Sequence, residues 1–257
     1  MRILLTIEYF GKNYAGWQRQ KNAISVQQVL EEKLSLVLQS PIVLSASGRT
    51  DSGVHALGQK AHFDYDGNFP VGKIAFAVNT TLPEDIRVLS AVKVPDDFHA
   101  QYSAKRKTYV YKTYVSRTLH PLKNYHFARI PYDKVDFEKM KRACNDLIGT
   151  HDFSGFSSTG SGIKTTVRTI YSATLTKDGE DITLEITGNG FLYNMVRIIA
   201  GTLAYIGAGL LPEDSVKIVL DTKNRKLAGK TFPPQGLYLK EVVYEDSSDI
   251  KTEDNGR

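Results

Sequence analysis

The sequence predicts an α+β protein built from two related halves. Short runs rich in alternating apolar residues, typical of strands, are separated by segments whose apolar residues recur every three or four positions, as in helices. The order strand, helix, strand, strand, helix, strand occurs in residues 1–104, and a similar series occurs in residues 105–246. With 257 residues, each half is long enough to bury a core of its own.

The first half begins with a predicted strand at residues 2–7. A helix follows, with Ser25 as its N-cap and Gln28 completing a capping box. One face of this helix is apolar and carries Val26, Val29, Leu30, Leu34, Val37 and Leu38. The other predicted elements are strands at 42–46 and 60–65, a weak helix at 72–82 and a strand at 86–92.

The second half begins with a long predicted strand from Lys105 through Tyr109 and Tyr111. Its first helix has an apolar stripe formed by Phe137, Met140, Ala143, Cys144, Leu147 and Ile148. We expect Gly149 to cap this helix. Further elements are expected as strands at 167–177 and 181–188, helices at 193–207 and 213–220, and a last strand at 237–244. The Gly/Ser-rich residues 154–162 are expected to be a flexible linker, and residues 247–257 a disordered tail.

The composition excludes several classes of protein. A single cysteine, Cys144, cannot form a disulfide framework or a cysteine zinc site, and it fits a reducing, cytoplasmic compartment. The apolar runs are too short to span a membrane, and the chain begins with a strand pattern rather than a signal peptide. The six histidines are scattered and no glycine-rich phosphate loop follows a strand. We therefore expect no metal and no nucleotide cofactor.

The charge distribution suggests a polyanionic partner. The net charge of the chain is +5. Residues 245–257 hold five acidic and two basic side chains, so this tail carries −3 and the rest of the chain carries +8. A basic body of this kind favours nucleic acid as the partner.

The most informative stretch is residues 48–56, which read GRTDSGVHA. They place Asp51 in a tight turn between two predicted strands, where a loop exposes its carboxylate. Arg49, two residues earlier, would orient this carboxylate and favour its ionised, nucleophilic form. The alternative is ordinary turn chemistry, with Arg49 as a surface partner of Asp51 and His55 as a hydrogen-bonding residue that stabilises the turn.

Residues 98–132 form a basic stretch that lacks acidic residues. Its cations are Lys105, Arg106, Lys107, Lys112, Arg117, Lys123 and Arg129. They alternate with Tyr102, Tyr109, Tyr111, Tyr114 and Tyr125. Because cations bind phosphates and aromatic rings stack on unpaired bases, the stretch predicts contacts with RNA. The alternative is an edge strand kept in solution by its lysines.

Two further features of the second half favour a site. Tyr109 and Tyr111 lie two residues apart on a strand, so their rings share a face and one of them could meet a flipped base. The alternative is cross-strand aromatic packing. Arg197 lies off the apolar stripe of the 193–207 helix, and Gly201 one turn later leaves room for another group beside it. Arg197 is either a partner for a carboxylate at the site or a solvated side chain.

Two rival functions fit parts of the sequence. Asp51-Ser52-Gly53 spells the Asp-Ser/Thr-Gly of aspartic proteases. No second copy of that motif occurs in the chain, and Arg49 would oppose the sharing of a proton between two aspartates. A non-catalytic RNA-binding module would explain the charge and the tyrosines but not the Asp51 turn.

Residues 48–56 also carry a family resemblance. The chain resembles the tRNA pseudouridine synthase A family over nearly its full length, and the family pattern GRTDAGVHA is matched except at Ser52. Further matches in the family's order are Tyr9-Phe10-Gly11, Tyr14-Ala15-Gly16-Trp17-Gln18, Val78-Asn79, Leu82-Pro83, Asp85-Ile86, Phe98-His99-Ala100, Ser103-Ala104, Tyr109, Met195-Val196-Arg197, Gly201 and Gly236-Leu237-Tyr238-Leu239. The departures are Ser52 for alanine, Phe10 for aspartate or histidine, Gln101 for arginine, and the variant stretch 106–108.

The resemblance implies the pseudouridine synthase fold, in which two ferredoxin-like halves are joined through antiparallel sheets, with helices on one face and a central active-site cleft. It implies Asp51 as catalytic nucleophile and Tyr109 as the ring that stacks on the target uracil. Arg49 and Arg197 are implied as polar partners in the cleft. The expected substrate contacts are Tyr109, Lys105, Arg106, Lys107, His55 and Leu237.

The resemblance also implies the reaction and the partner. The expected substrate is tRNA, held by a homodimer, with uridines at positions 38, 39 or 40 of the anticodon stem-loop as targets and no cofactor. In this isomerisation the uracil leaves C1′, turns, and is rejoined through C5. Asp51 could attack C6 of the uracil or C1′ of the ribose, and both routes use the same ionised carboxylate.

Overall fold

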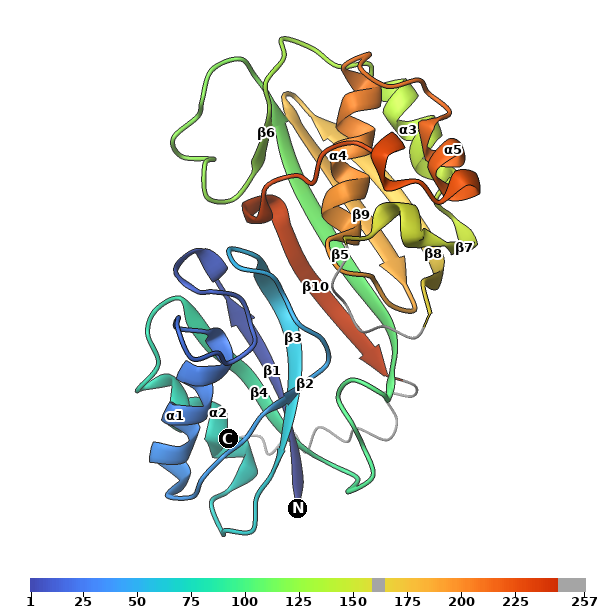
Figure 1. Cartoon of the computed structure of the whole chain (residues 1–257). Coiled ribbons are helices and arrows are strands. Elements are labelled where there is room, and N and C mark those ends of the chain that lie inside the picture. The colour runs from blue at the N-terminus through green and yellow to red at the C-terminus, as the bar shows by residue number, and fades with distance from the viewer. Residues whose placement is uncertain (159–164, 245–257) are drawn as a thin grey trace. The chain divides into compact units, whose positions relative to one another are not determined.

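The computed structural model describes residues 1–158 and 165–244 and divides into two compact units (Figure 1). The first unit is Met1–Lys105 together with the chain from Leu239 onward, and the second is Arg106–Tyr238. Each unit combines mainly antiparallel strands with helices, which confirms the α+β class. The predicted tail and residues 159–162 of the predicted linker lie outside the described residues.

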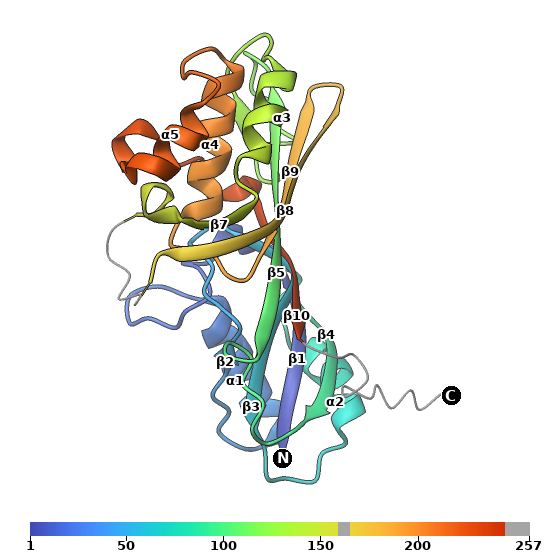
Figure 2. The same ribbon diagram turned by 90° about the vertical axis from the view of Figure 1, so that its right-hand side faces the viewer.

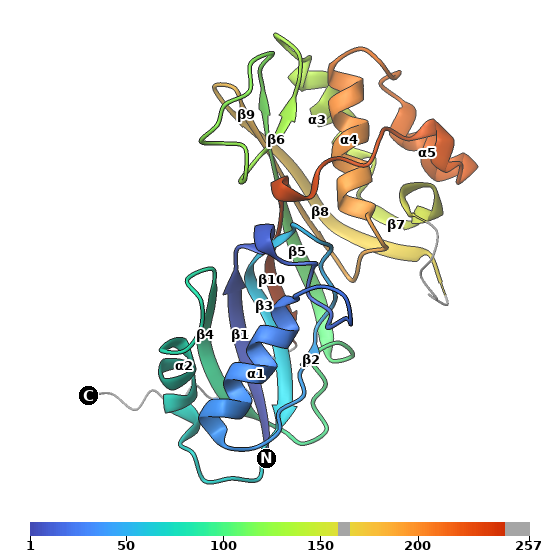
Figure 3. The same ribbon diagram turned by 60° about the vertical axis from the view of Figure 1, so that its left-hand side comes forward.

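The first unit follows the predicted order of strand, helix, strand, strand, helix, strand. Its elements are β1 (Arg2–Tyr9), the 3-10 helix η1 (Gly11–Asn13), α1 (Val26–Leu38), β2 (Ser45–Ala46), β3 (His55–Asp64), α2 (Val71–Asn79) and β4 (Ile86–Val94). The strand order is β4-β1-β3 with β2 paired to β3, which is the ferredoxin-like arrangement. Both helices lie on one face of these strands (Figures 1 and 3).

Helix α1 forms largely as its sequence predicts. The hydroxyl of Ser25 accepts a hydrogen bond from the N–H of Gln28 at 3.2 Å, so the N-cap is confirmed. The amide nitrogen of Gln28 in addition donates to the Glu32 carboxylate at 3.0 Å, one turn further along the helix. The fully buried residues of the apolar stripe recur at four-residue intervals, namely Val26, Leu30, Leu34 and Leu38.

The predicted strand at 42–46 is wrong over its first three residues. Only Ser45 and Ala46 pair with β3. The N–H of Ile42 donates to the hydroxyl of Ser35, and the N–H of Leu44 donates to the carboxylate of Glu31. Side chains of α1 therefore take the hydrogen bonds that a neighbouring strand would otherwise make.

The second unit combines several strands with three α-helices. Its elements are β5 (Ala104–Val115), β6 (Ala128–Ile130), α3 (Phe137–Asn145), β7 (Gly149–Asp152), η2 (Phe153–Phe156), β8 (Val167–Asp178), β9 (Asp181–Gly188), α4 (Met195–Gly207), α5 (Ser215–Thr222), η3 (Arg225–Leu227), η4 (Pro234–Gly236) and the start of β10 (Leu237–Tyr244). Strands β5, β9, β8 and β7 are neighbours in that order and antiparallel, while β6 runs parallel to β5. The three α-helices lie on one face of these strands (Figure 2).

Two predictions for the second unit are wrong. Helix α3 ends at Asn145 with Asp146 as its C-cap, and Gly149, with φ of 117°, begins β7 instead of capping the helix. The helix ends early because the N–H groups of residues 146–148 bond to carbonyls three residues back, in tight turns. Residues 154–156 of the predicted linker form η2 between the buried rings of Phe153 and Phe156, so packing fixes them.

The last described strand contributes to the first unit from Leu239 onward. Strand β10 is the neighbour of β3, and a side chain at Gly58 would lie 2.7 Å from the Lys240 carbonyl, so only glycine permits this close approach. The hydroxyl of Tyr244 donates to the Ala100 carbonyl at 2.9 Å. These contacts group the strand at 239–244, which the sequence pattern places in the second half, with the first unit.

Candidate active site

The Asp51 turn immediately precedes β3 in the first unit. The N–H of Val54 donates to the Asp51 carbonyl at 3.1 Å, which closes the turn, and Gly53 adopts φ of 78°. The carboxylate-bearing residue is half-buried. A turn of this type presents one side chain from a backbone that is itself hydrogen-bonded.

Residues 9–17 hold this turn from one side. The N–H of Trp17 donates to the Thr50 carbonyl at 3.0 Å, and a hydrogen bond of 2.7 Å links the hydroxyls of Tyr9 and Thr50. The hydroxyl of Ser52 donates to the Tyr14 carbonyl at 3.1 Å. The backbone on both sides of Asp51 is therefore fixed by a segment some forty residues earlier in the chain.

Two glycines make this close approach possible. A side chain at Gly11 would lie 1.9 Å from the Val54 carbonyl oxygen. Gly16 adopts φ of 87°, and a side chain there would lie 2.5 Å from the Thr50 carbonyl oxygen. Any larger residue at either position would push the two segments apart.

Arg49 and His55 flank the turn in different ways. Arg49 is exposed on one side of the turn. His55 is buried, and its Nδ1 accepts a hydrogen bond from the Gly11 N–H at 2.9 Å. Its ring stacks on Phe10 at 4.6 Å with the planes 3° apart. This geometry is that of a turn-stabilising histidine.

Tyr109 lies on β5 in the second unit, opposite Ile186 of β9. Its ring is half-buried and meets Phe191 edge to face, with 5.0 Å between the ring centroids. Tyr111 occupies the same face of the strand but is buried, and its hydroxyl donates to the Pro233 carbonyl at 2.6 Å. Of the two tyrosines, Tyr111 therefore has the packing role, and Tyr109 keeps part of its ring accessible within this unit.

Arg197 lies in the first turn of α4 and is held through its guanidinium. Nε donates to the Phe232 carbonyl at 2.8 Å, and Nη1 donates to the Asn194 side-chain oxygen at 2.7 Å. A side chain at Gly201 would lie 1.9 Å from the Lys230 carbonyl oxygen. The space that this glycine was predicted to leave is thus filled by the backbone around residue 230, and Arg197 is ordered rather than solvated.

The predicted RNA-contact residues differ in exposure. Lys105 and Arg106 are exposed, Lys107 is half-buried, and Leu237 is buried. Burial, together with the nearby charge of Arg168, lowers the pKa of Lys107 to about 8. A lysine in such an environment gains from an anionic partner.

Each unit therefore gathers part of the predicted set. The first holds Asp51, Arg49, His55 and Lys105, and the second holds Lys107, Tyr109, Arg197 and Leu237 together with the exposed Arg106. Sequence reasoning missed Phe191 and Asn194, which contact Tyr109 and Arg197. The Asn194–Arg197 contact could have been predicted from spacing, because Asn194 lies three residues before Arg197 and side chains three residues apart are neighbours on a helix.

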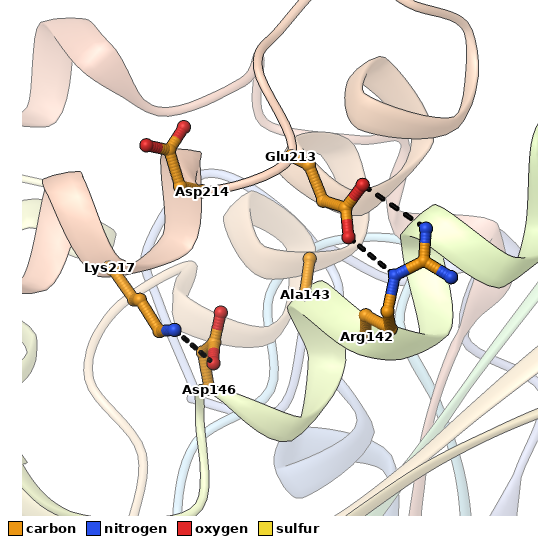
Figure 4. Close-up of a pocket in the computed structure, with 6 residues that line it drawn as sticks. All are labelled: Arg142, Ala143, Asp146, Glu213, Asp214 and Lys217. Atoms are coloured by element: carbon orange, nitrogen blue, oxygen red, sulfur yellow. Dashed lines mark hydrogen bonds and ion pairs between the residues drawn. The ribbon is translucent and has the colours of Figure 1, made fainter.

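A surface pocket of about 360 Å³ lies elsewhere in the second unit, between α3 and α5 (Figure 4). It is lined by Arg142, Ala143, Asp146, Glu213, Asp214 and Lys217. Ion pairs cross it from Arg142 to Glu213 and from Lys217 to Asp146. They connect the two helices, and none of the predicted site residues lines this pocket.

Residues 1–158 and 165–244 hold neither a metal-binding cluster nor a membrane-spanning helix. No three His, Cys, Asp or Glu side chains gather there in a way that could hold a metal ion. No helix in the same ranges is both long and apolar enough to cross a membrane.

Comparison with known sequences decides the family. A sequence model described as tRNA pseudouridine synthase matches residues 5–103 and 143–245. The chain belongs to this family. It is therefore a pseudouridine synthase, an isomerase, and the aspartic protease interpretation of Asp51-Ser52-Gly53 is wrong.

Relatives named tRNA pseudouridine synthase A cover almost the whole chain. Those from Thermoanaerobacter sp. (strain X514) and Caldicellulosiruptor bescii are each 47% identical over 242 residues, which is 94% of this chain and 99% of theirs. The one from Streptococcus equi subsp. equi is 44% identical over 248 residues, covering 95% of this chain and 99% of its own.

Among solved structures, the archaeal box H/ACA sRNP Nop10-Cbf5 complex includes a chain that is 10% identical, with a TM-score of 0.40 over 94% of this chain and 49% of that one. A Cbf5-Nop10-Gar1 complex gives a TM-score of 0.36 at 10% identity, over 93% of this chain and 59% of that one. Similarity at this level adds nothing to the family assignment.

Proposed function

We propose that this enzyme converts uridine to pseudouridine in tRNA, with Asp51 as its nucleophile. The observation that carries the proposal is the Asp51 turn of the GRTDSGVHA stretch. Hydrogen bonds from Tyr9, Tyr14 and Trp17 hold this turn in place. A carboxylate presented from a fixed turn suits a nucleophile, because its backbone does not have to be ordered during reaction.

The chemistry needs only one carboxylate. The C1′–N1 bond breaks, a C1′–C5 bond forms, a proton leaves C5, and N1 ends with a proton, so neither oxidant nor reductant is consumed. Asp51 attacks either C6 of the uracil or C1′ of the ribose. In both routes the detached base must be held while it turns, and stacking on Tyr109 supplies that restraint.

Arg197 and Arg49 have different parts in this proposal. Arg197 is ordered before substrate binds, through Phe232 and Asn194, and it faces the reacting groups as a fixed cation. Arg49 is exposed and takes a polar group of the RNA when the target nucleotide enters. Lys105, Arg106 and Lys107 contact phosphates, His55 supports the turn beside the nucleotide, and Leu237 packs beside the bound base.

The proposed target lies in the anticodon stem-loop, at uridines 38, 39 or 40. Turning a nucleotide out of a helix costs a few kcal/mol, which ring stacking and phosphate contacts offset. The basic body of the chain supplies those phosphate contacts. We further propose that the enzyme acts as a cytoplasmic homodimer and that it needs no cofactor.

The experiment uses tRNA carrying tritium at C5 of its uridines. Incubated with wild-type protein in the presence of a chelator, this tRNA releases tritium to water when pseudouridine forms. A second tRNA, with cytidine in place of uridine at positions 38 to 40, is the matched control. We expect release from the first tRNA and none from the second.

Two results would contradict the proposal. Release from both tRNAs would place the target outside positions 38 to 40. Binding of tRNA without any release would mean that the chain is a non-catalytic RNA-binding module, the second function that its charge and tyrosines fit.

A further inference from the structure

Tyr102 is the most exposed aromatic residue of the basic stretch at 98–132. Its exposed fraction is 78%, whereas Tyr111 and Tyr114 in the same stretch are at most 1% exposed. The structure thus separates the tyrosines of this stretch into core rings and surface rings. An exposed tyrosine needs a second feature to be more than ordinary surface.

The second feature is that the Tyr102 ring packs against the ring of His99. The Tyr102 and His99 rings lie 4.3 Å apart with their planes tilted by 33°. Nδ1 of His99 accepts hydrogen bonds from the N–H groups of Gln101 at 3.1 Å and Tyr102 at 3.4 Å. The His99 ring is therefore fixed by the backbone of the very turn that carries Tyr102.

The turn itself is fixed by side chains from distant parts of the first unit. Nδ1 of His62 accepts from the Ala100 N–H at 3.2 Å, and Nη1 of Arg2 donates to the Phe98 carbonyl at 2.7 Å. Tyr244 donates to the Ala100 carbonyl, and the hydroxyl of Ser103 accepts from the His99 N–H at 3.0 Å. These side-chain bonds hold the turn in place, and they restrict the freedom that a loop tyrosine normally has.

Further rings pack behind His99, with their planes at steep angles to one another. His62 packs edge-on to His99 at 4.8 Å and to Phe98 at 6.4 Å, and Phe98 contacts Tyr244 at 4.8 Å. Burial and the nearby charge of Arg2 lower the pKa of His62, which keeps this inner ring neutral. Tyr102 is thus the exposed member of a cluster of aromatic rings that also contains His99, His62, Phe98 and Tyr244.

We propose that the outer face of Tyr102 is a stacking platform for an unpaired RNA base, a contact additional to the one made by Tyr109. The proposal rests on RNA being the substrate. A ring that contacts His99 and yet stays 78% exposed suits a base, because every base has a flat face that can stack on it. Lys105 and Arg106, exposed a few residues later, supply cations for the phosphates on either side of that base.

The first test measures tRNA affinity and turnover together. Tyr102→Ala should weaken tRNA binding about tenfold, within the range found for base-stacking aromatics, while turnover at saturating tRNA stays unchanged. Tyr102→Phe should bind like wild type. Tyr102→Leu, which is apolar but not aromatic, should behave like the alanine variant. Phe76→Ala is the matched control, because Phe76 of α2 is 77% exposed in the same unit and should have no effect.

The salt dependence separates stacking from charge. Because a stacked ring releases no counterions, the slope of log affinity against log salt should be the same for Tyr102→Ala and wild type. Equal losses in Tyr102→Ala and Phe76→Ala, or wild-type affinity in Tyr102→Leu, would overturn the platform. These readings concern binding, so they hold or fail separately from the tritium release that tests the reaction.

A fluorescence experiment reports the stack directly. The only tryptophan, Trp17, is 1% exposed, so Tyr102→Trp adds a single exposed reporter. Its emission should be quenched by tRNA and unaffected by a blunt RNA duplex that has no unpaired base. Equal emission with and without saturating tRNA would contradict the proposal.

Discussion

The hydrogen bonds described at the Asp51 turn and at the start of helix α4 act on different groups. Around Asp51 the hydrogen bonds described above hold the backbone, through Thr50, Ser52 and Val54. At Arg197 they hold the side chain itself, through Phe232 and Asn194. Each place also depends on a glycine, Gly11 at the turn and Gly201 in the helix. A Cβ at either residue would lie 1.9 Å from a backbone carbonyl oxygen.

This difference matches the two roles proposed. A nucleophile needs a defined starting position, and the hydrogen bonds to Thr50, Ser52 and Val54 supply it by fixing the turn that carries Asp51. A cation that stabilises charge works best when it is oriented beforehand. Substitutions that act on the backbone should therefore affect the two regions differently from those that act on side chains.

Gly201→Ala should have the largest effect on stability. The new methyl group meets the Lys230 carbonyl, which is backbone and cannot turn away, so we expect a loss of about 3 kcal/mol or more. Gly72→Ala is the control, because nothing lies within 4 Å of that position in α2. It should gain roughly 0.5 to 1 kcal/mol through helix propensity. Urea unfolding of both variants measures this, and similar stabilities would contradict the packing described at Gly201.

Arg197→Lys should reduce turnover by roughly 30- to 100-fold, equivalent to about 2 to 3 kcal/mol of barrier. Lysine keeps the positive charge but lacks the planar guanidinium. It therefore cannot donate to Phe232 and Asn194 and at the same time offer further N–H donors to the substrate. Single-turnover tritium release gives the rate, and tRNA affinity should change little. A rate close to that of wild type would show that charge alone is needed at this position.

Lys107 should make tRNA binding depend on pH. Its pKa is lowered to about 8, so the amine is charged below that pH and loses its charge as the pH rises through it. Affinity should therefore fall between about pH 7 and about pH 9 as the phosphate contact loses its cation. Lys107→Arg, which stays charged, should flatten this part of the profile. The same fall in the arginine variant would assign the pH dependence to another group.

Ser52→Ala should have the smallest effect. It restores the residue usual in the family and removes the hydrogen bond from Ser52 to the Tyr14 carbonyl. We expect a loss of roughly 0.5 to 1.5 kcal/mol in stability and turnover within about threefold of wild type. Thermal unfolding and tritium release measure the two quantities. A large loss of rate would mean that this bond, rather than Thr50, sets the geometry of the turn.

Much of the fold could be predicted from the sequence because local rules governed it. The N-cap at Ser25, the apolar stripe of α4 and the paired strands near 167–188 all depend on short-range spacing. The strand at 42–44 and the cap at Gly149 could not be predicted in this way. At 42–44, side chains of α1 accept hydrogen bonds from the backbone N–H groups that a strand partner would otherwise use. Near Gly149, the helix ends in 3-10 turns for which the sequence has no recognisable signal.

In the candidate site, too, some features follow from short-range sequence patterns and others depend on distant segments. Motif and spacing predict Asp51 and Arg197 as site residues, whereas the hydrogen bonds that hold them come from distant segments of the chain. Arg197 depends on a carbonyl 35 residues later in the chain, and Asp51 on a segment that precedes it by some forty residues. The exposed position of Arg49 agrees with one of the two alternatives that the sequence left open, a surface residue beside the turn.

The most direct measurement compares Asp51→Asn with wild type in three quantities: tritium release in a single turnover, tRNA affinity and thermal unfolding. Asparagine keeps the size of the side chain and leaves the turn's backbone bonds in place, so affinity and stability should be nearly unchanged. Release should fall by at least ~1000-fold, equivalent to about 4 kcal/mol of barrier. Release at a comparable rate, from a variant that folds and binds as wild type does, would contradict the central claim that Asp51 is the nucleophile.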